Sequence, residues 1–164
     1  MNENGTWRIW PPLFLAFVLQ TSVLARLEIA GAHLDLPLLV VLCVALVLGW
    51  REGLLCGLVT GMTTAYLVAK NPGALAFSVL MTGAVVGLTT RASWRENPFA
   101  PPLLAALGTL FCDAIVLVMT PTDFSISWWL HHTPVRMLTN AVFIWPVLRV
   151  LSRWLNPPSK LRFG

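Results

Sequence analysis

Six apolar stretches, each about long enough to cross a lipid bilayer, account for nearly all of this 164-residue chain. A transmembrane helix needs roughly 20 mainly apolar residues to span the hydrocarbon core. The stretches cover residues 11–27, 34–50, 53–69, 73–90, 101–119 and 134–155, and only short hinges separate them. We therefore predict an all-α integral membrane protein, a six-helix transmembrane bundle that forms a single domain over residues 1–164.

The composition agrees with this class and predicts an orientation. Charged residues make up 11% of the chain, whereas soluble domains contain about 25%. Basic residues outnumber acidic ones by 11 to 7, and in a membrane protein such an excess reports topology rather than nucleic-acid binding. If the N-terminus is cytoplasmic, the inner segments hold most of the basic residues: Arg8, Arg51, Arg91, Arg95, Arg149, Arg153, Lys160 and Arg162. We expect both termini to be cytoplasmic.

Residues 34–69 allow two interpretations, because only Trp50, Arg51 and Glu52 separate the second and third stretches. The first is a helical hairpin, and the second is one long helix. We favour the hairpin, since a charged pair at the bilayer centre is costly and Gly49 and Gly53 flank it.

Small residues form a stripe on the third and fourth stretches. Glycines recur every four residues at Gly53, Gly57 and Gly61, and again at Gly83 and Gly87. Small residues at this spacing let two helix backbones approach closely within a membrane. The stripe either packs neighbouring helices of this chain together or receives a helix from a partner protein.

The longest outer segment, residues 120–133, combines polar and large apolar side chains. Such a segment can lie on the membrane surface with its apolar side chains in the interface. We expect partner contact here through Phe124, Ile126, Trp128 and Trp129.

Polar side chains recur at one depth of the predicted bundle. Gln20, Thr63, Asp113 and Asn140 each lie six or seven residues from the outer end of their stretch, and Arg136 lies one turn above Asn140. An acid at this depth should face the bundle interior or a partner. The layer is therefore a structural hydrogen-bond network, a proton or substrate site, or a recognition surface for a partner.

Catalysis finds little support in the sequence. A nucleophile needs a base within hydrogen-bond reach, and no such motif is present. His131 and His132 are adjacent, so on a helix their side chains point about 100° apart and do not form a metal pair. The cysteines lack the spacing of a metal site. We expect no enzyme, cofactor or metal.

Several short motifs occur along the chain in an order that resembles a known family. The motifs are Gln20–Thr21, Asp35–Leu36, Arg51–Glu52–Gly53, Gly57 with Gly61, Pro72–Gly73, and Arg136, Asn140–Phe143, Pro146 and Leu148–Arg149 in the last stretch. In this order and at these spacings, the chain resembles the rod shape-determining MreD family over residues 13–154.

This resemblance implies a non-enzymatic scaffold of the cell-elongation machinery in the bacterial inner (cytoplasmic) membrane. Such a scaffold binds the single-span protein MreC and supports peptidoglycan synthesis and rod cell shape. Through MreC it would reach the actin-like MreB, RodA and a class B penicillin-binding protein. We also expect contact with membrane lipids, and no nucleic-acid partner.

The same family is similar in fold to the six-helix S-components of energy-coupling-factor transporters. This likeness gives the alternative function, a small-molecule (vitamin)-binding S-component. Residues 14–27, however, lack the Ala-x-x-x-Ala pattern with which S-components dock their partner, and fold alone does not establish function.

Overall fold

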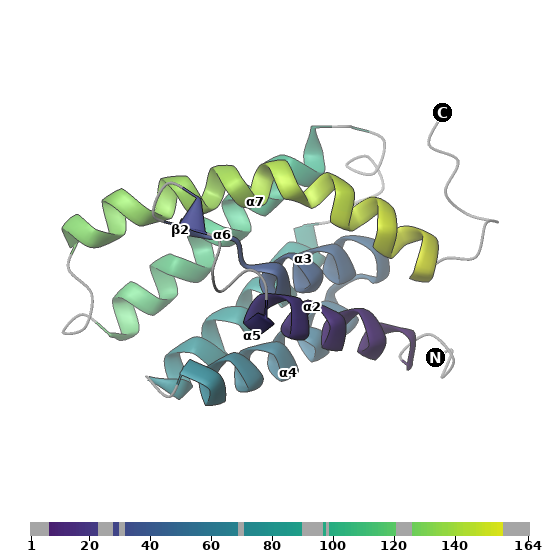
Figure 1. Ribbon diagram of the computed structural model, residues 1–164, viewed down its shortest axis with the longest axis horizontal. Coiled ribbons are helices and arrows are strands. Elements are labelled where there is room, and N and C mark those ends of the chain that lie inside the picture. The colour runs from purple at the N-terminus through teal and green to yellow at the C-terminus, as the bar shows by residue number, and fades with distance from the viewer. Residues whose placement is uncertain are drawn as a thin grey trace.

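The computed structural model describes residues 7–22, 28–29, 32–68, 71–89, 97, 99–120 and 126–155. It is a bundle of α-helices, with α6 and α7 along one side and α4 and α5 along the other (Figure 1). The elements are η1 (Trp7–Ile9), α2 (Trp10–Ser22), α3 (Leu36–Leu48), α4 (Trp50–Val68), α5 (Pro72–Thr89), α6 (Ala100–Met119) and α7 (Ile126–Leu155). Two-residue strands, β1 (Glu28–Ile29) and β2 (Ala32–His33), pair antiparallel between α2 and α3.

The sequence predicts six membrane spans, but fewer of the described helices are long and apolar enough to cross a bilayer. Among the described residues, three do so: Pro72–Thr89, Ala100–Met119 and Trp129–Leu155. The apolar helix α3 has only 13 residues, which is short for a bilayer about 30 Å thick. The predicted first span ends at residue 27, outside the described residues, and Thr60, Thr63 and Thr64 make α4 more polar than a typical span.

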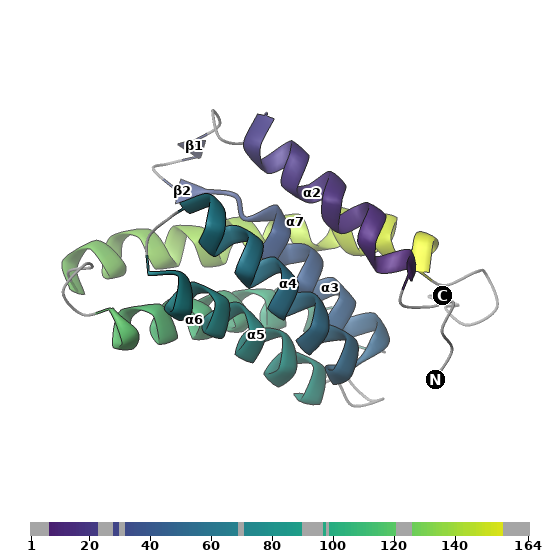
Figure 2. The same cartoon turned by 90° about the horizontal axis from the view of Figure 1, so that it is seen from below.

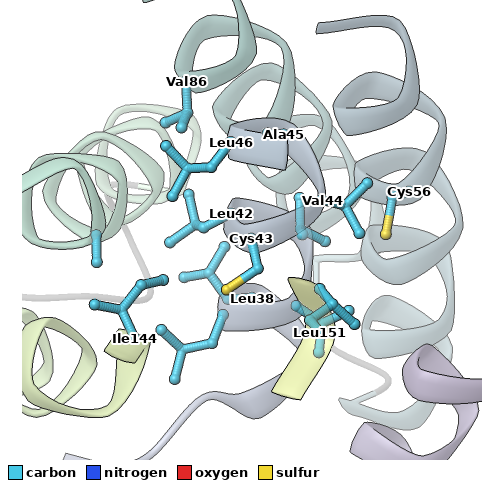
Figure 3. Packing of buried hydrophobic residues seen from close by; sticks show 14 of the residues in the cluster. Leu38, Leu42, Cys43, Val44, Ala45, Leu46, Cys56, Val86, Ile144 and Leu151 are labelled. Carbon is cyan, nitrogen blue, oxygen red and sulfur yellow. The ribbon is translucent and has the colours of Figure 1, made fainter. Parts of the chain in front are cut away.

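Helix α3 forms the centre of the bundle. It packs against α2, α4, α5, α6 and α7, and every residue from Pro37 to Leu46 is buried. Figure 3 shows Leu38, Leu42 and Cys43 of this helix within the apolar core that surrounds it. A helix that is apolar on all sides is typical of a protein core or of a membrane span, and here the other helices of the chain surround it.

The hairpin interpretation of residues 34–69 agrees with the structure. α3 ends at Leu48 and α4 begins at Trp50, with Gly49 between them at φ +110° and ψ −171°. This backbone region is essentially restricted to glycine. A Cβ built on Gly53 would lie 2.7 Å from the Ala45 Cβ, so the two helices are in close contact beside the turn.

Gly49→Ala tests this turn. A Cβ at Gly49 would meet nothing within 4 Å, so the substitution strains only the backbone. We expect a loss of about 1–3 kcal/mol in the free energy of unfolding, measured by denaturant titration in mild detergent. Gly73→Ala, which also has open space around it, is the control and should be close to neutral. An unchanged stability for Gly49→Ala would contradict the assigned turn.

The last helix is longer than the sequence suggested. α7 begins at Ile126 rather than at Pro134, and both Pro134 and Pro146 lie inside it. Proline is common in the first turn of a helix, which is why Pro134 suggested a start. Proline lacks a backbone N–H, so the carbonyl one turn earlier loses its hydrogen bond. Membrane helices tolerate this because neighbouring groups can donate to that carbonyl instead. Ile126–Thr133 is therefore part of α7 and not a separate surface segment.

Successive helices alternate in direction, so the bundle has two ends. The C-terminal ends of α2, α4 and α6 meet the N-terminal ends of α3, α5 and α7 at one end, which we call the Asp35 end. At the opposite end, the start of α2 lies beside the end of α7 (Figure 2). There, Trp154 Nε1 donates a hydrogen bond of 3.1 Å to the Arg8 carbonyl.

Candidate functional site

An ion-paired cluster at the Asp35 end joins three helices. Arg136 of α7 donates from Nη1 to Asp113 Oδ1 of α6, and from Nη2 to Asp35 Oδ2 at 2.9 Å. Asp35 directly precedes α3. The guanidinium presents several donors in a fixed plane, so a single arginine can bind both carboxylates at once. The central helix is thereby tied to α6 and α7.

The second oxygen of each carboxylate also accepts a hydrogen bond. Asp35 Oδ1 accepts from the Leu38 backbone N–H at 3.1 Å and so caps α3. Asp113 Oδ2 accepts from Thr133 Oγ1 at 3.1 Å. Buried charge is tolerated when it is paired and its remaining hydrogen-bonding sites are filled. This arrangement explains how charged side chains are accommodated inside an apolar bundle.

A second polar contact joins α6 and α7 one helical turn from the first. Asn140 Nδ2 donates to Thr109 Oγ1 at 2.9 Å, and Thr109 Oγ1 donates in turn to the Ala105 carbonyl at 2.8 Å. Asn140 is fully buried, and its Oδ1 has no described donor. Interhelical hydrogen bonds of this kind stabilise only modestly, by about 0.6 kcal/mol on average. Their main effect is to fix which faces of α6 and α7 meet.

A pocket opens beside the cluster. It has a volume of about 360 Å³ and lies between α2, the start of α3 and the end of α4. Gln20 forms part of its wall, and Gln20 Oε1 accepts from the Leu36 backbone N–H at 3.2 Å. The lining residues are Phe17, Gln20, Thr21, Asp35, Pro37, Thr64, Leu67 and Val68. The site thus combines a carboxylate, hydroxyl and amide groups with apolar walls.

The predicted polar layer is only partly a single network. Asp113 and Arg136 are in direct contact, and Asn140 lies one turn away. Gln20 reaches the N-terminal end of α3 beside Asp35. Thr63 takes no part in the cluster, because its hydroxyl donates to the Val59 carbonyl of its own helix at 2.8 Å.

Sequence reasoning missed three members of this site. Asp35 is the most important, since it binds Arg136 and caps α3. The Asp–x–Pro pattern at residues 35–37 is a helix-start signal that could have indicated its position. Thr109 and Thr133 gave no comparable signal, because a threonine in an apolar helix is more often bonded to its own backbone.

The glycine stripes lie inside the bundle. Gly53, Gly57, Gly61, Gly83 and Gly87 are all buried. The first three face α5: an added Cβ would lie 2.6 Å from the Gly83 carbonyl oxygen, 2.8 Å from that of Val79 and 2.7 Å from that of Ala76, respectively. Gly87 faces the Trp50 backbone. This packing leaves the stripes no free face for a partner helix, in agreement with the internal-packing interpretation.

The aromatic segment before residue 134 is described only in part. Phe124 lies outside the described residues, as does the side chain of Trp128. Ile126 is exposed in the first turn of α7. Trp129 is partly buried, and its indole N–H has no partner among the described groups.

The described residues contain no cluster of three His, Cys, Asp or Glu side chains that could hold a metal ion. Cys43, Cys56 and Cys112 are buried free thiols that form no disulfide bond.

Asp113→Asn tests whether the cluster is structural. The amide oxygen can still accept from Arg136 and the amide N–H can donate to the Thr133 hydroxyl, while the ion pair between Arg136 and Asp35 remains. We expect a loss of about 1–3 kcal/mol in the free energy of unfolding, with assembly and partner binding preserved. Thermal unfolding and co-purification of the variant measure both properties. Complete loss of function in a normally assembled variant would contradict a structural role.

Comparison with known protein families identifies one family that matches most of this chain. The family model described as 5TMR of 5TMR-LYT, a domain of five transmembrane helices, matches residues 4–148. The chain belongs to this family. No curated protein and no solved structure matched the chain. Membership of the 5TMR family agrees with the three long apolar helices and indicates a multi-span membrane protein.

Proposed function

We propose that this chain is a non-enzymatic scaffold of the cell-elongation machinery in the bacterial inner membrane. The main support for this proposal is that polar side chains inside the bundle join its helices to one another. Arg136, Asp113 and Asp35 tie α3, α6 and α7 together, while Asn140 and Thr109 add a second link. A bundle braced in this way is suited to presenting a rigid surface to another membrane protein.

The proposed partner is MreC, the single-span protein that the resemblance to the MreD family implies. Support comes from the order of the motifs along the chain, and two of them supply Asp35 and Arg136, two of the three charged side chains of the cluster. Asp35–Leu36 supplies the cap of α3, and the motif from Arg136 to Asn140 supplies both links of α7. MreB, RodA and a class B penicillin-binding protein would associate with this chain indirectly, through MreC.

The proposed topology has both termini on the cytoplasmic side. It is supported by the distribution of basic residues and by the contact between Trp154 and Arg8 at one end of the bundle. Six crossings leave the termini on the same side of the membrane, whereas five leave them on opposite sides. A fluorescent reporter that folds only in the cytoplasm should therefore be active at either terminus. Activity at one terminus alone would favour five crossings and contradict this topology.

The alternative function is that of a vitamin-binding S-component. The pocket of about 360 Å³ beside Asp35 favours it, because ligand sites in proteins commonly enclose about 300–1,000 Å³. An S-component would carry a tightly bound small molecule and associate with transporter subunits that include ATPases.

Affinity purification from native membranes in mild detergent separates the two functions. Co-purifying proteins are identified by mass spectrometry, and extracted small molecules are analysed in parallel. Recovery of MreC with cell-wall synthases supports the scaffold. Recovery of transporter ATPases, or of a bound vitamin, would overturn it.

A further inference from the structure

A groove runs between α2 and α4 at the Asp35 end. Both helices pack against α3 but make little contact with each other. Figure 2 shows α2 at the edge of the bundle, beside α3 and α4. The pocket of about 360 Å³ lies in this groove, with Asp35 at its base.

The walls of the groove are mainly apolar, and its base is polar. Phe17, Leu67 and Val68 supply the apolar surface, and Leu67 is 54% exposed. Asp35 is partly open to the groove, with 30% of its side chain exposed, whereas Asp113 is only 10% exposed on the other side of Arg136. A side chain that enters the groove can therefore reach Asp35 directly.

The described acidic groups at the base outnumber the described basic ones. Among the described residues of the cluster, two carboxylates face one guanidinium, so with both carboxylates ionised these three side chains carry a formal charge of −1. The N-terminus of α3 adds only about half a positive charge. A carboxylate offers about four lone-pair sites, and Asp35 uses one on the Leu38 N–H and one on Arg136. The base can accept a further cationic donor.

We propose that this groove binds a membrane-spanning helix of a partner protein that carries a lysine or arginine at the level of Asp35. The inference rests on the proposed scaffold function and assigns its docking surface. Charge complementarity defines the partner: the long aliphatic stem of Lys or Arg covers apolar walls while its charged head reaches a polar group. The Gln20 amide and the Thr64 hydroxyl border the same space and can contact polar groups of the partner.

Site-specific photo-crosslinking in native membranes tests the groove. A photoreactive phenylalanine analogue replaces Leu67 in the groove or, as the matched control, Leu107 of α6, which is 47% exposed. We expect the Leu67 position to form an adduct with a single-span protein, mapped by mass spectrometry to within one helical turn of a Lys or Arg. The Leu107 position should give no such adduct. Adducts only with lipid, only with a second copy of this chain, or only from Leu107 would overturn the proposal.

Asp35→Asn tests the contribution of charge. Asparagine caps helices about as well as aspartate, so the start of α3 is retained while the charge is removed. We expect at least a tenfold lower adduct yield from Leu67, with the thermal midpoint within a few degrees of the wild-type value. Glu52→Gln removes the same charge at the opposite end of the bundle and serves as the control. Equal adduct yields in both variants would overturn the electrostatic basis of docking.

The outcomes separate this inference from the proposed function. If MreC co-purifies but Leu67 forms no adduct with it, the scaffold stands and the groove assignment fails. If MreC does not co-purify but Leu67 labels the span of another protein beside a basic residue, the groove stands and the scaffold assignment fails.

Discussion

Arg136→Met is expected to lower the free energy of unfolding by about 3–5 kcal/mol, the cost of leaving buried charges without their partner. Asp113 and Asp35 would both lose the guanidinium that binds them, and Asp113 lies well inside the bundle. Methionine keeps a long flexible side chain, so the loss of packing is small compared with the loss of the ion pairs. Chemical unfolding in mild detergent measures the change.

A compensating variant shows whether the loss is electrostatic. Asp35→Asn and Asp113→Asn, combined with Arg136→Met, remove all three charges and should recover most of the lost stability. Replacing a whole buried charge cluster is often close to neutral. If the single variant is as stable as the wild type, or if the triple variant is no better than the single one, the cluster is not what joins α3, α6 and α7.

Gly57→Val is expected to cause the second large loss. The Cβ of any substituent at this position would lie 2.8 Å from the Val79 carbonyl oxygen and 3.1 Å from the Leu80 Cα, so backbone would have to move. Overpacking typically costs about 1–3 kcal/mol, and we expect a value at the upper end because a rigid helix must shift. Thermal unfolding in detergent measures the effect.

Gly73→Val is the matched control for this substitution. It places the same side chain on α5 at a position where an added Cβ meets nothing within 4 Å. Its stability should stay within about 1 kcal/mol of the wild-type value, which is the range of helix propensity. Equal tolerance at the two positions would show that α4 and α5 do not pack through their glycines.

The sequence allowed the helical class and part of the site to be predicted. Apolar stretches of bilayer length predict membrane helices, and the family comparison agrees with this class. Asp113 and Arg136 could be placed in one layer because charged groups in a membrane must face the protein interior. The distance of each residue from the outer end of its stretch placed Asp113 at the depth of Asn140, with Arg136 one turn above.

Other features depend on packing that the sequence does not encode locally. The start of α7 at Ile126 could not be predicted, since Pro134 is a typical helix-start residue and tolerance of an internal proline depends on neighbouring groups. The glycine stripes fit either an internal or an external helix, because the same spacing serves both. Asp35 precedes an apolar stretch, so nothing in its local sequence indicates an arginine 101 positions away.

Direct binding between the purified chain and purified MreC, both in lipid nanodiscs or mild detergent, tests the central claim. Fluorescence titration of labelled MreC measures the dissociation constant, and thermal unfolding shows that the chain is folded. We expect saturable binding without any bound small molecule. A folded chain that fails to bind MreC but retains a vitamin would contradict the scaffold and establish the pocket beside Asp35 as a substrate site.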